Sequence, residues 1–409
     1  MVDEAVCKDM GNATATVTAR HPTAGVRPPM TDRWATAVSF ESRTGRTPVL
    51  DAGVGPITHE RYLPVERGSH LWGRLPCAAD SPVMTVEPGD SVTVDTLSHE
   101  GILEDQGRDP RAFFGAEGVP PELVLADAVE VAASGPFRDP TKDGPHVVSG
   151  PIRVTGARPG DLLKISVLGT QQRVPYGVIS NRHGRGALPD RFPEGADPVS
   201  VFAAVEEGGD FASIPIRRGD PRRVRFPLRP FLGVMGVAVS GDIRPHSVPP
   251  GPHGGNIDIT LLTAGSALYL PVQVDGALAY VGDPHFAQGD GEVALTAMEA
   301  SLRVDLRFDV LSQSDAQREF GDLAGPLAET SEFLVPTGMH EDLDEAMREC
   351  VRAAVALLEA RFGMEPHLAY AYLSAATDFS ISQVVDLVKG VHARVRVADF
   401  GAIRGPGRG

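Results

Sequence analysis

The amino-acid sequence predicts a mainly β protein with a sandwich or jelly-roll core and helices near its C-terminus. Three observations support this prediction. The 409 residues include 45 Gly and 35 Pro but only 6% aromatic residues, which favours many short strands over a helical bundle. A motif of strand, tight turn and strand recurs along the chain. After about residue 325, the spacing of apolar residues changes from that of strands to that of a helix.

The recurring motif occurs first at residues 82–96. Its turn at 87–90 has Pro88 and Gly89 at the central positions, which suits a type II turn. A second copy has its turn at 158–161, between strands at 152–155 and 162–167, and a looser third copy spans 258–274. Strands joined by tight turns are expected to pair into antiparallel sheets. The repetition reflects either an internal duplication or only a shared turn chemistry.

The remaining elements follow from the apolar pattern. Further strands are expected at 224–227, 233–239, 277–282 and 292–310. One more strand is expected at 35–42, within an irregular N-terminal arm. Apolar residues three or four apart predict a helix at 342–362, which begins among acidic residues and ends before Gly363. A second helix is expected at 366–376 and a disordered tail at 404–409.

These elements predict three parts of the chain. Residues 1–60 form an N-terminal extension, and residues 61–325 form a β-sandwich core with an insertion near 105–145. Residues 326–409 form a C-terminal helical segment that packs on this core.

Charge and composition exclude several classes of protein. The formal net charge of −16 argues against a nucleic-acid partner and against binding to an anionic membrane, because both need a basic face. The N-terminus lacks the basic start and apolar run of a signal peptide, and no stretch is long and apolar enough to span a membrane. The three cysteines contain no CxxC pair, so neither a disulfide framework nor a thiolate zinc site is indicated. We therefore expect a reduced, cytoplasmic protein.

The side chains most able to perform chemistry are concentrated at residues 250–292. Asp283 and His285 are two residues apart, so on an extended chain they point to one face and can bind one ion. Such residues are typical ligands of a catalytic zinc, which keeps one position open for water. Asp290 and Glu292 have the same spacing, and one of them is a candidate base for that water. Each motif alone is also typical of an ordinary loop or hairpin turn, and only their concentration favours a site.

A second candidate cluster follows the first strong strand. Asp95 and His99 lie at or after its end, where active-site groups are common. The acidic residues that follow are expected in an ordinary solvated loop: Glu100, Glu104 and Asp105. The basic loop at 181–186 is a candidate lid or a simple flexible loop. A nucleophilic mechanism has less support, because no G-x-S-x-G elbow is present and Cys77 and Cys350 suit small core positions.

Several stretches resemble, in order and spacing, the acetamidase/formamidase family. The resemblance covers roughly residues 80–390. Its most specific stretches are Leu-Gly-Val-Met-Gly-Val-Ala at 232–238, His-Gly-Gly-Asn-Ile-Asp at 253–258, Tyr-Leu-Pro-Val at 269–272, Gly-Asp-Pro-His at 282–285 and Gly-Asp-Gly-Glu at 289–292. Earlier and later stretches at 149–152, 159–161 and 380–386 fit as well.

The resemblance implies a fold, an activity and a site. The fold is a jelly-roll-like β-sandwich with added α/β elements in a homo-oligomer, for which a dimer is expected. The activity is hydrolysis of short amides to a carboxylic acid and ammonia, with a divalent metal, zinc or calcium. The implied catalytic residues are His253, Asp290 and Glu292. The implied metal ligands are Asp95, His99, Asp258, Asp283 and His285.

One position departs from the family pattern. Asp95 and Thr96 fit it, but Ser98 stands where a second acid is expected. Either His99 replaces that acid as a ligand, or the chain belongs to a subgroup with altered substrate or metal preference. The insertion near 105–145 is consistent with such a subgroup and could narrow the pocket or serve an oligomer interface.

The resulting hypothesis is a metal that polarises the amide carbonyl and lowers the pKa of water. Glu292 or Asp290 takes the water proton and returns it to the leaving nitrogen. His253, or the amides of Gly254 and Gly255, stabilise the oxyanion. Two alternatives stay open: a hydrolase of the same fold that acts on a larger amide or carbamate, and a non-catalytic jelly-roll protein that binds a small ligand or a partner.

Overall fold

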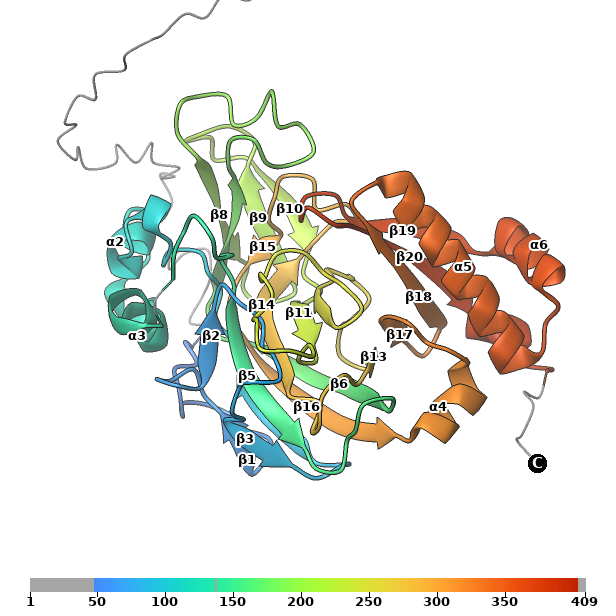
Figure 1. The fold of residues 1–409 in the computed structure, drawn as a ribbon. Coiled ribbons are helices and arrows are strands. Elements are labelled where there is room, and N and C mark those ends of the chain that lie inside the picture. The colour runs from blue at the N-terminus through green and yellow to red at the C-terminus, as the bar shows by residue number, and fades with distance from the viewer. Residues whose placement is uncertain (1–47, 137, 404–409) are drawn as a thin grey trace, which may run out of the picture. The chain divides into compact units, whose positions relative to one another are not determined.

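Two large β-sheets form most of the structure (Figure 1), a computed structural model that describes residues 48–136 and 138–403. The strand expected at 35–42 and the tail at 404–409 lie outside the described residues. In spatial order, the nine-stranded sheet contains β1 (Arg61–Leu63), β4 (Ser91–Asp95), β16 (Leu302–Leu311), β6 (Leu162–Gln172), β13 (Ala267–Pro271), β17 (Leu327–Glu329), β18 (Phe333–His340), β20 (Lys389–Arg396) and β19 (Asp378–Gln383).

The second sheet has eleven strands. Its main path is β10 (Arg223–Pro227), β9 (Phe211–Pro215), β8 (Val199–Val205), β7 (Tyr176–Asn181), β15 (Met298–Glu299), β14 (Ala279–Ala287), β11 (Phe231–Gly236) and β12 (Gly254–Asn256). Beside this path, β5 (Val147–Val154) pairs with β14, β2 (His70–Trp72) and β3 (Met84–Val86). The prediction of a mainly β protein is confirmed, and the jelly-roll connectivity stays a prediction.

The recurring turns connect the two sheets. Gly89 and Gly160 have φ values of 94° and 98°, as a type II turn requires at its third residue, and each turn closes with a backbone hydrogen bond. However, β3 and β5 before these turns belong to the eleven-stranded sheet, whereas β4 and β6 after them belong to the nine-stranded sheet. The expectation that each turn joins two paired strands is therefore wrong. In the third copy, residues 258–261 form no strand.

The core lies between the two sheets, and its position explains why apolar and polar residues alternate along the strands. Its largest apolar cluster combines Val92, Leu163 and Val304 from the nine-stranded sheet with Leu232 and Val281 from the other. All five side chains are at most 1% exposed. Burial of apolar side chains contributes roughly 1.5–3 kcal/mol for each residue, which makes the sandwich the main source of stability.

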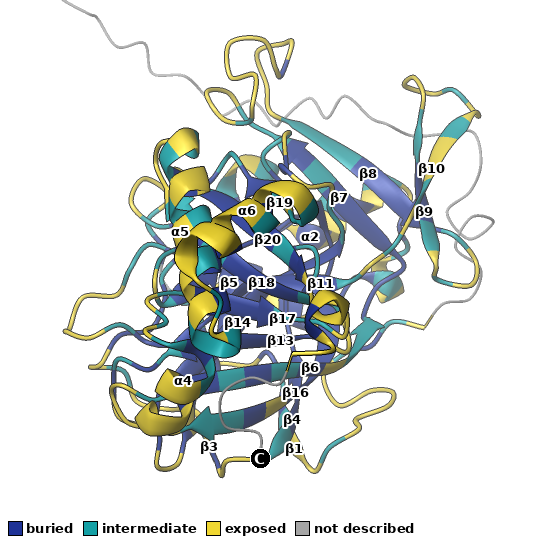
Figure 2. Cartoon of the chain, turned by 90° about the vertical axis from the view of Figure 1, so that its right-hand side faces the viewer, coloured by how far each residue is buried: buried dark blue, intermediate teal, exposed yellow. Residues whose placement is uncertain are grey.

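The C-terminal helices form as the sequence predicts. α5 (Leu343–Phe362) begins after Asp342, whose side chain accepts a hydrogen bond from the Glu345 amide, and ends at Gly363 with φ 66°. α6 (Pro366–Ala376) follows. One stripe of α5 packs on β18 and β20, whereas the outer faces of α5 and α6 are exposed (Figure 2). Besides these helices, residues 326–403 contribute β17 to β20, so this segment extends the sheet as well.

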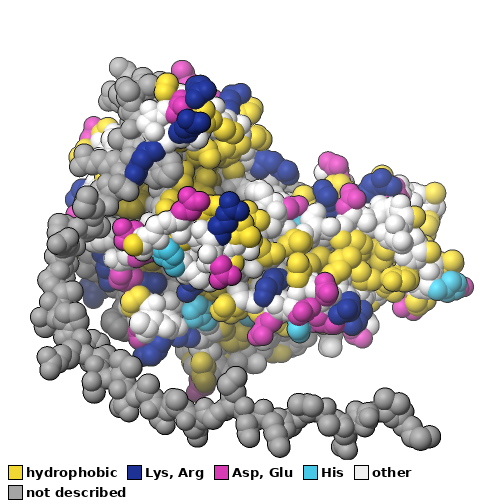
Figure 3. Space-filling view, turned by 90° about the horizontal axis from the view of Figure 1, so that it is seen from above, with side chains coloured by type: hydrophobic (Ala, Val, Ile, Leu, Met, Phe, Trp, Pro, Cys, Tyr) yellow, Lys and Arg dark blue, Asp and Glu magenta, His cyan; other side chains and the backbone are white. Residues whose placement is uncertain are grey.

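Shorter helices lie elsewhere. The insertion near 105–145 contains α2 (Pro110–Gly115) and α3 (Ala126–Ser134), and α4 (Gln313–Phe320) follows β16. Three 3-10 turns complete the described elements: η1 (Glu104–Gln106), η2 (Pro121–Leu123) and η3 (Val397–Phe400). Within the described residues, no helix is long and apolar enough to cross a membrane. On the face in Figure 3, acidic, basic and apolar side chains are interspersed.

The strands around the candidate site differ from their predicted bounds. β14 continues past the predicted end at 282 to Ala287, so Asp283 and His285 lie on a strand at the sheet's centre. The strand expected at 292–310 is interrupted and begins only at β15. Glu292 and Leu295 have φ values of 46° and 119°, which no strand tolerates.

Candidate active site

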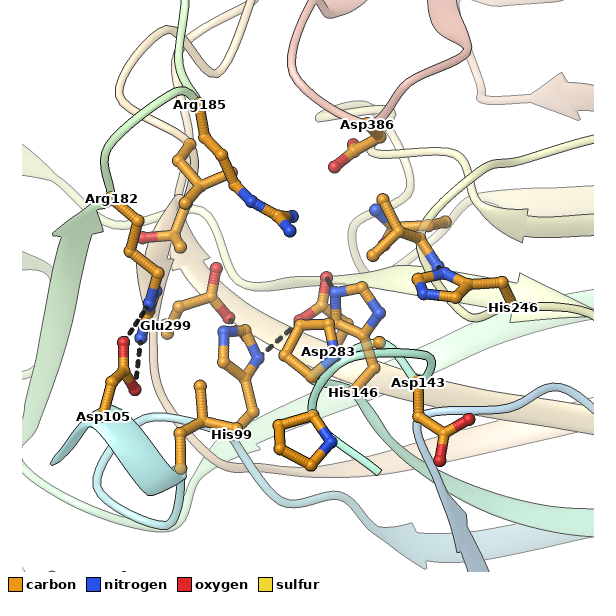
Figure 4. Close-up of a pocket in the computed structure, with 18 of the residues that line it drawn as sticks. His99, Asp105, Asp143, His146, Arg182, Arg185, His246, Asp283, Glu299 and Asp386 are labelled. Atoms are coloured by element: carbon orange, nitrogen blue, oxygen red, sulfur yellow. Dashed lines mark hydrogen bonds and ion pairs between the residues drawn. The ribbon is translucent and has the colours of Figure 1, made fainter. Parts of the chain in front are cut away.

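A cavity of about 330 Å³ lies where loops and strand ends from both sheets meet. Its acidic floor is formed by side chains that are distant in sequence (Figure 4). Asp283 comes from β14, Glu299 from β15, and Glu292 from the turn between them. His99 follows β4, His146 immediately precedes β5, and Asp386 follows β19.

Asp283 is the centre of the cluster. Its Oδ1 lies 3.4 Å from His99 Nδ1, and its Oδ2 lies 3.7 Å from His146 Nε2 and 3.0 Å from His285 Nε2. Glu299 Oε1 is also 3.0 Å from His285 Nε2. All of these side chains are buried. Asp283 therefore belongs to two groups with metal-ligand spacing, one with His99 and His146 and one with His285 and Glu299.

A third group adjoins the second. Asp258 and Glu292 lie near His285, and ligand atoms of the three residues are all within 4.8 Å of one another. Asp258 Oδ1 is 3.8 Å from His285 Nδ1. The turn that contains Glu292 bridges to the end of β19, because Gly291 and Gln383 form a parallel β-bridge. This bridge brings Asp386 to the same floor.

The imidazole orientations are fixed by neighbouring groups. The Gln288 side-chain amide donates to the carbonyls of Asp258 and Ser382, so its Oε1 must face His285 Nδ1 at 3.0 Å. His285 Nδ1 therefore carries the proton, and Nε2 faces the carboxylates of Asp283 and Glu299. A metal-binding histidine commonly donates its other N–H in this way.

His146 shows the same arrangement. Its Nδ1 lies 3.1 Å from the Ser247 carbonyl, which can only accept, so Nδ1 donates and Nε2 faces Asp283. Burial lowers the pKa of His146 to about 4, so the ring is neutral at pH 7. A neutral ring that turns its lone pair toward a carboxylate is unfavourable unless a cation lies between them.

The backbone is strained at the same residues. Asp258, Asp283 and Glu292 have φ values of 48°, 50° and 46°, in the left-handed region that non-glycine residues seldom occupy. Such strain is held in place by surrounding structure and is concentrated at functional sites.

The acids of the floor outnumber its protonated histidines. Although burial lowers the pKa of both rings, the neighbouring carboxylates raise the pKa of His99 to about 10 and the pKa of His285 well above its usual value, so both rings are charged when no metal is bound. Burial, followed by repulsion from neighbouring carboxylates, raises the pKa of Asp258 and Glu292 well above their usual range and also raises that of Glu299. Burial likewise raises the pKa of Asp386 to about 7. Burial also favours the neutral form of Asp283, but the adjacent histidines hold its pKa well below its usual range. A bound cation would let the whole set ionise.

Two further observations fit a metal ion. Several buried floor atoms have no hydrogen-bond partner within the described part of the chain: both imidazole nitrogens of His99, both oxygens of Asp258, Asp283 Oδ1, His285 Nε2, Glu299 Oε2 and Asp386 Oδ2. In addition, Gly233 on β11 leaves space below the cluster. A Cβ there would lie 2.5 Å from Asp258 Oδ1 and 2.7 Å from Asp283 Oδ2. These nitrogen and oxygen donors can therefore hold a divalent metal.

Comparison with known proteins identifies the family of the chain. The model of the acetamidase/formamidase family matches residues 136–246 and 245–397. The chain belongs to the acetamidase/formamidase family. It is similar to a formamidase from Methylophilus methylotrophus, with 30% identity over 305 residues, which are 59% of this chain and 74% of that protein. An acetamidase from Mycolicibacterium smegmatis is 30% identical over 217 residues, 41% of this chain and 53% of the relative.

Solved structures in the same family share the fold. The acetamidase from Bacillus halodurans has a TM-score of 0.64 at 25% identity and covers 82% of this chain and 98% of its own. The acetamidase from Yersinia enterocolitica has a TM-score of 0.65 at 25% identity, with 88% and 98% covered. The sequence-based predictions of the acetamidase/formamidase family and of an amidase are therefore confirmed.

Five of the eight predicted site residues belong to the cluster around Asp283, and three of them, His99, Asp283 and Glu292, line the cavity. The five are His99, Asp258, Asp283, His285 and Glu292. Their roles in this acetamidase/formamidase family member stay predictions. His99 Nδ1 lies 3.4 Å from Asp283 Oδ1, and the replacement of the expected acid by His99 stays a prediction.

Asp95 was expected as a metal ligand, and the geometry contradicts this. β4 pairs with β16 so that Asp95 lies opposite Arg303, whose Nε and Nη2 donate to its two oxygens at 2.6 and 3.0 Å. Tyr62 donates to the same carboxylate, and Arg173 Nη2 lies 3.7 Å away. Asp95 has no oxygen free for a metal and belongs to a structural ion pair.

Asp290 and His253 also lie away from the floor. Asp290 is exposed and accepts a hydrogen bond from Thr260 Oγ1 at 2.9 Å. His253 is absent from the cavity lining, and burial lowers its pKa to about 4. The Gly254 amide donates to the Gly251 carbonyl, so it is not available for an oxyanion. For Asp290 the reason is local, since Gly291, with φ 103°, turns the chain between Asp290 and Glu292.

The sequence analysis missed several floor and wall residues. His146, Glu299 and Gln288 have no motif of their own, although His146 and His253 both follow a Gly-Pro pair. Asp386 ends a stretch used for the family resemblance and could have been found there. Glu100 was expected in a solvated loop, but it is 3% exposed and accepts a hydrogen bond from Ser180 Oγ.

Proposed function

We propose that the chain hydrolyses small amides to a carboxylate and ammonia with the help of a divalent metal held by the cavity floor. The observation that carries the proposal is the set of buried carboxylate and imidazole groups gathered around Asp283 and above Gly233, several atoms of which have no hydrogen-bond partner among the described residues. A bound divalent cation supplies Lewis acidity, which polarises an amide carbonyl and acidifies water. Formamide and acetamide are the first substrates to test, because the relatives are a formamidase and an acetamidase.

Zinc suits this donor set better than calcium does. His99, His146 and Asp283 provide two imidazole nitrogens and a carboxylate, a combination that zinc favours, whereas calcium takes oxygen ligands. His146 and His285 would each bind through Nε2, since their Nδ1 protons are held by Ser247 and Gln288.

We assign the general base to Glu292. It lines the cavity and is buried, whereas Asp290 points to solvent. In the proposed reaction, Glu292 accepts a proton from the attacking water as the C–O bond forms. It then delivers that proton to the amide nitrogen as the C–N bond breaks, so ammonia leaves and the carboxylate remains. Asn256 lines the same cavity and is the proposed donor to the developing oxyanion.

The described residues that line the cavity offer no side chain suited to act as a covalent nucleophile. Among the described residues that line the cavity, none is a serine, cysteine or lysine. The hydroxyls of Thr141 and Thr296 are already bonded to Asp139 and to the Ala297 carbonyl. Ser382 contacts His392, but both are buried and absent from the lining. This favours water as the nucleophile.

The test is ammonia release from formamide and acetamide by purified protein, before and after chelation and after zinc is restored. We expect activity to disappear on chelation and to return with zinc. Glu292→Gln should lower kcat by about 100-fold or more, the effect of losing a general base. Asp290→Asn is the matched control and should retain activity. Full activity of the metal-free protein, or normal turnover by Glu292→Gln, would contradict the proposal.

A larger amide is the second candidate substrate, and the cavity volume of about 330 Å³ favours it. A panel of amides that differ in acyl size separates it from the first. The predicted homodimer stays a proposal that light scattering can test.

A further inference from the structure

The wall of the cavity carries three arginines, of which two are already paired. Arg182 Nε lies 2.6 Å from Asp105 Oδ2, and its Nη1 lies 3.5 Å from Glu100 Oε1. Arg138 pairs with Glu104, and its Nε donates to the Gly144 carbonyl at 2.7 Å. The charges of these two residues are therefore balanced inside the protein.

Arg185 differs from both. It lines the same cavity from the loop between β7 and β8, and its guanidinium points into the cavity (Figure 4). Within the part of the chain that the structure describes, no carboxylate pairs with it. A guanidinium is always charged and presents a planar fork of donors that matches a carboxylate.

The loop that holds Arg185 is attached to the catalytic segment. Asn181 Nδ2 donates to the Ala294 carbonyl at 2.6 Å, and the Ala187 amide donates to the Val293 carbonyl at 2.9 Å. Both acceptors immediately follow Glu292. These bonds fix both ends of the loop relative to the floor, and the exposed Arg185 lies between them.

The cavity has room for more than a short amide. At about 30 Å³ for each water in the liquid, its volume of about 330 Å³ corresponds to about eleven waters. Acetamide has only four non-hydrogen atoms. Burial lowers the pKa of His246 in the same lining and leaves its ring neutral at pH 7, so among the described lining residues Arg185 is the cation that no carboxylate pairs with.

We propose that the natural substrate is an amide that also carries a carboxylate, which Arg185 binds while the amide lies over the floor. This inference rests on the proposed amide hydrolysis and names its substrate class. A carboxylate suits the site better than a phosphate, because one negative charge is repelled less than two by the acidic floor. Arg185 is therefore the specificity-determining residue.

The test compares two amides of the same size and shape. Succinamate, the monoamide of succinic acid, carries the carboxylate, and levulinamide has a neutral acetyl group in its place. Zinc-loaded native enzyme should prefer succinamate in kcat/KM, and the preference should fall as ionic strength rises. Arg185→Gln should reduce the ratio of the two kcat/KM values by about 10- to 100-fold, the effect of losing hydrogen bonds to a charged group. The change should lie mainly in KM. Arg191→Gln, on the same loop but absent from the cavity lining, is the matched control and should keep the native ratio.

Several outcomes would overturn the inference. One is an unchanged ratio of the two kcat/KM values in Arg185→Gln, whether kcat/KM falls equally for both substrates or for neither. Another is a native enzyme that prefers levulinamide. If no amide is turned over, the proposed hydrolysis fails. Calorimetric measurement of succinamate binding to the native and Arg185→Gln proteins then tests the carboxylate site separately. Weaker binding by the variant supports the carboxylate site, whereas equal binding or none rejects it.

Discussion

Two clusters of buried charge lie close together in the sequence but are balanced in different ways. Asp95 ends β4, and His99 follows it by four residues. Around Asp95, each carboxylate meets an arginine: Arg303 binds Asp95, and Arg173 binds Asp127 Oδ2 at 2.6 Å. Around His99, carboxylates outnumber the cations, and many buried polar atoms have no hydrogen-bond partner among the described residues. Burial alone therefore does not identify a functional acid, whereas the identity of its partner does.

The largest expected effect is a loss of stability when the ion pair between Asp95 and Arg303 is broken. Asp95→Ala leaves Arg303 buried without its carboxylate, so we expect it to lower the free energy of unfolding by about 3–5 kcal/mol. Denaturant unfolding of the metal-free protein measures this loss. Protein that still folds should bind zinc as the native protein does, and loss of the metal would restore Asp95 as a ligand. Replacing both partners, as in Asp95→Leu with Arg303→Met, should recover much of the stability.

The next effect concerns the cluster of carboxylates and histidines around Asp283. Asp283→Asn should lower zinc affinity and kcat/KM by about 100-fold or more, since it changes the residue shared by two ligand groups. Although burial acts in the opposite direction, the adjacent histidines hold the pKa of Asp283 below its usual range, so its charge also stabilises the metal-free protein above about pH 4. Asp283→Asn should therefore lower the free energy of unfolding of the metal-free protein at pH 7 as well. Titration with zinc and denaturant unfolding test both parts. A destabilised variant that retains normal zinc affinity would place Asp283 in the same class as Asp95.

A smaller effect is expected from the residue that orients His285. Gln288→Ala removes the acceptor of the Nδ1 proton and should weaken zinc binding by about tenfold. Competition with a chromophoric chelator measures the affinity. Unchanged affinity would mean that packing alone orients the ring.

The smallest expected effect concerns an ion pair at the protein surface, between Asp80 and Arg244. Arg244 donates to Asp80, and, although burial acts in the opposite direction, this contact lowers the pKa of Asp80. A lowered folded-state pKa stabilises the protein above the unfolded value of about 4, and the contribution is lost as the pH falls further. Because Arg244 is largely exposed, Arg244→Gln should cost at most about 1 kcal/mol at pH 7. Unfolding at pH 7 and pH 3 should show this difference at pH 7 only.

Local patterns predicted much of the fold. The bounds of α5 and α6 follow from apolar spacing, Asp342 and Gly363, because helix signals act within a few residues. The type II turns follow from Pro-Gly pairs for the same reason. Which strands these turns join was not predictable, because pairing depends on residues far away in the chain.

For the site, the sequence by itself predicted Asp283, His285 and Glu292 as candidates, because two-residue spacing and the family motif are local. It could not separate Asp95 from His99, which are both polar residues near one strand end. Only the tertiary structure decided that Arg303 neutralises Asp95, because β16 is about 200 residues away in the chain. The same long-range pairing brings His146, Glu299 and Asp386 to the floor and aims Arg185 at the cavity. Charge balance is a property of neighbours in space, and sequence spacing does not record it.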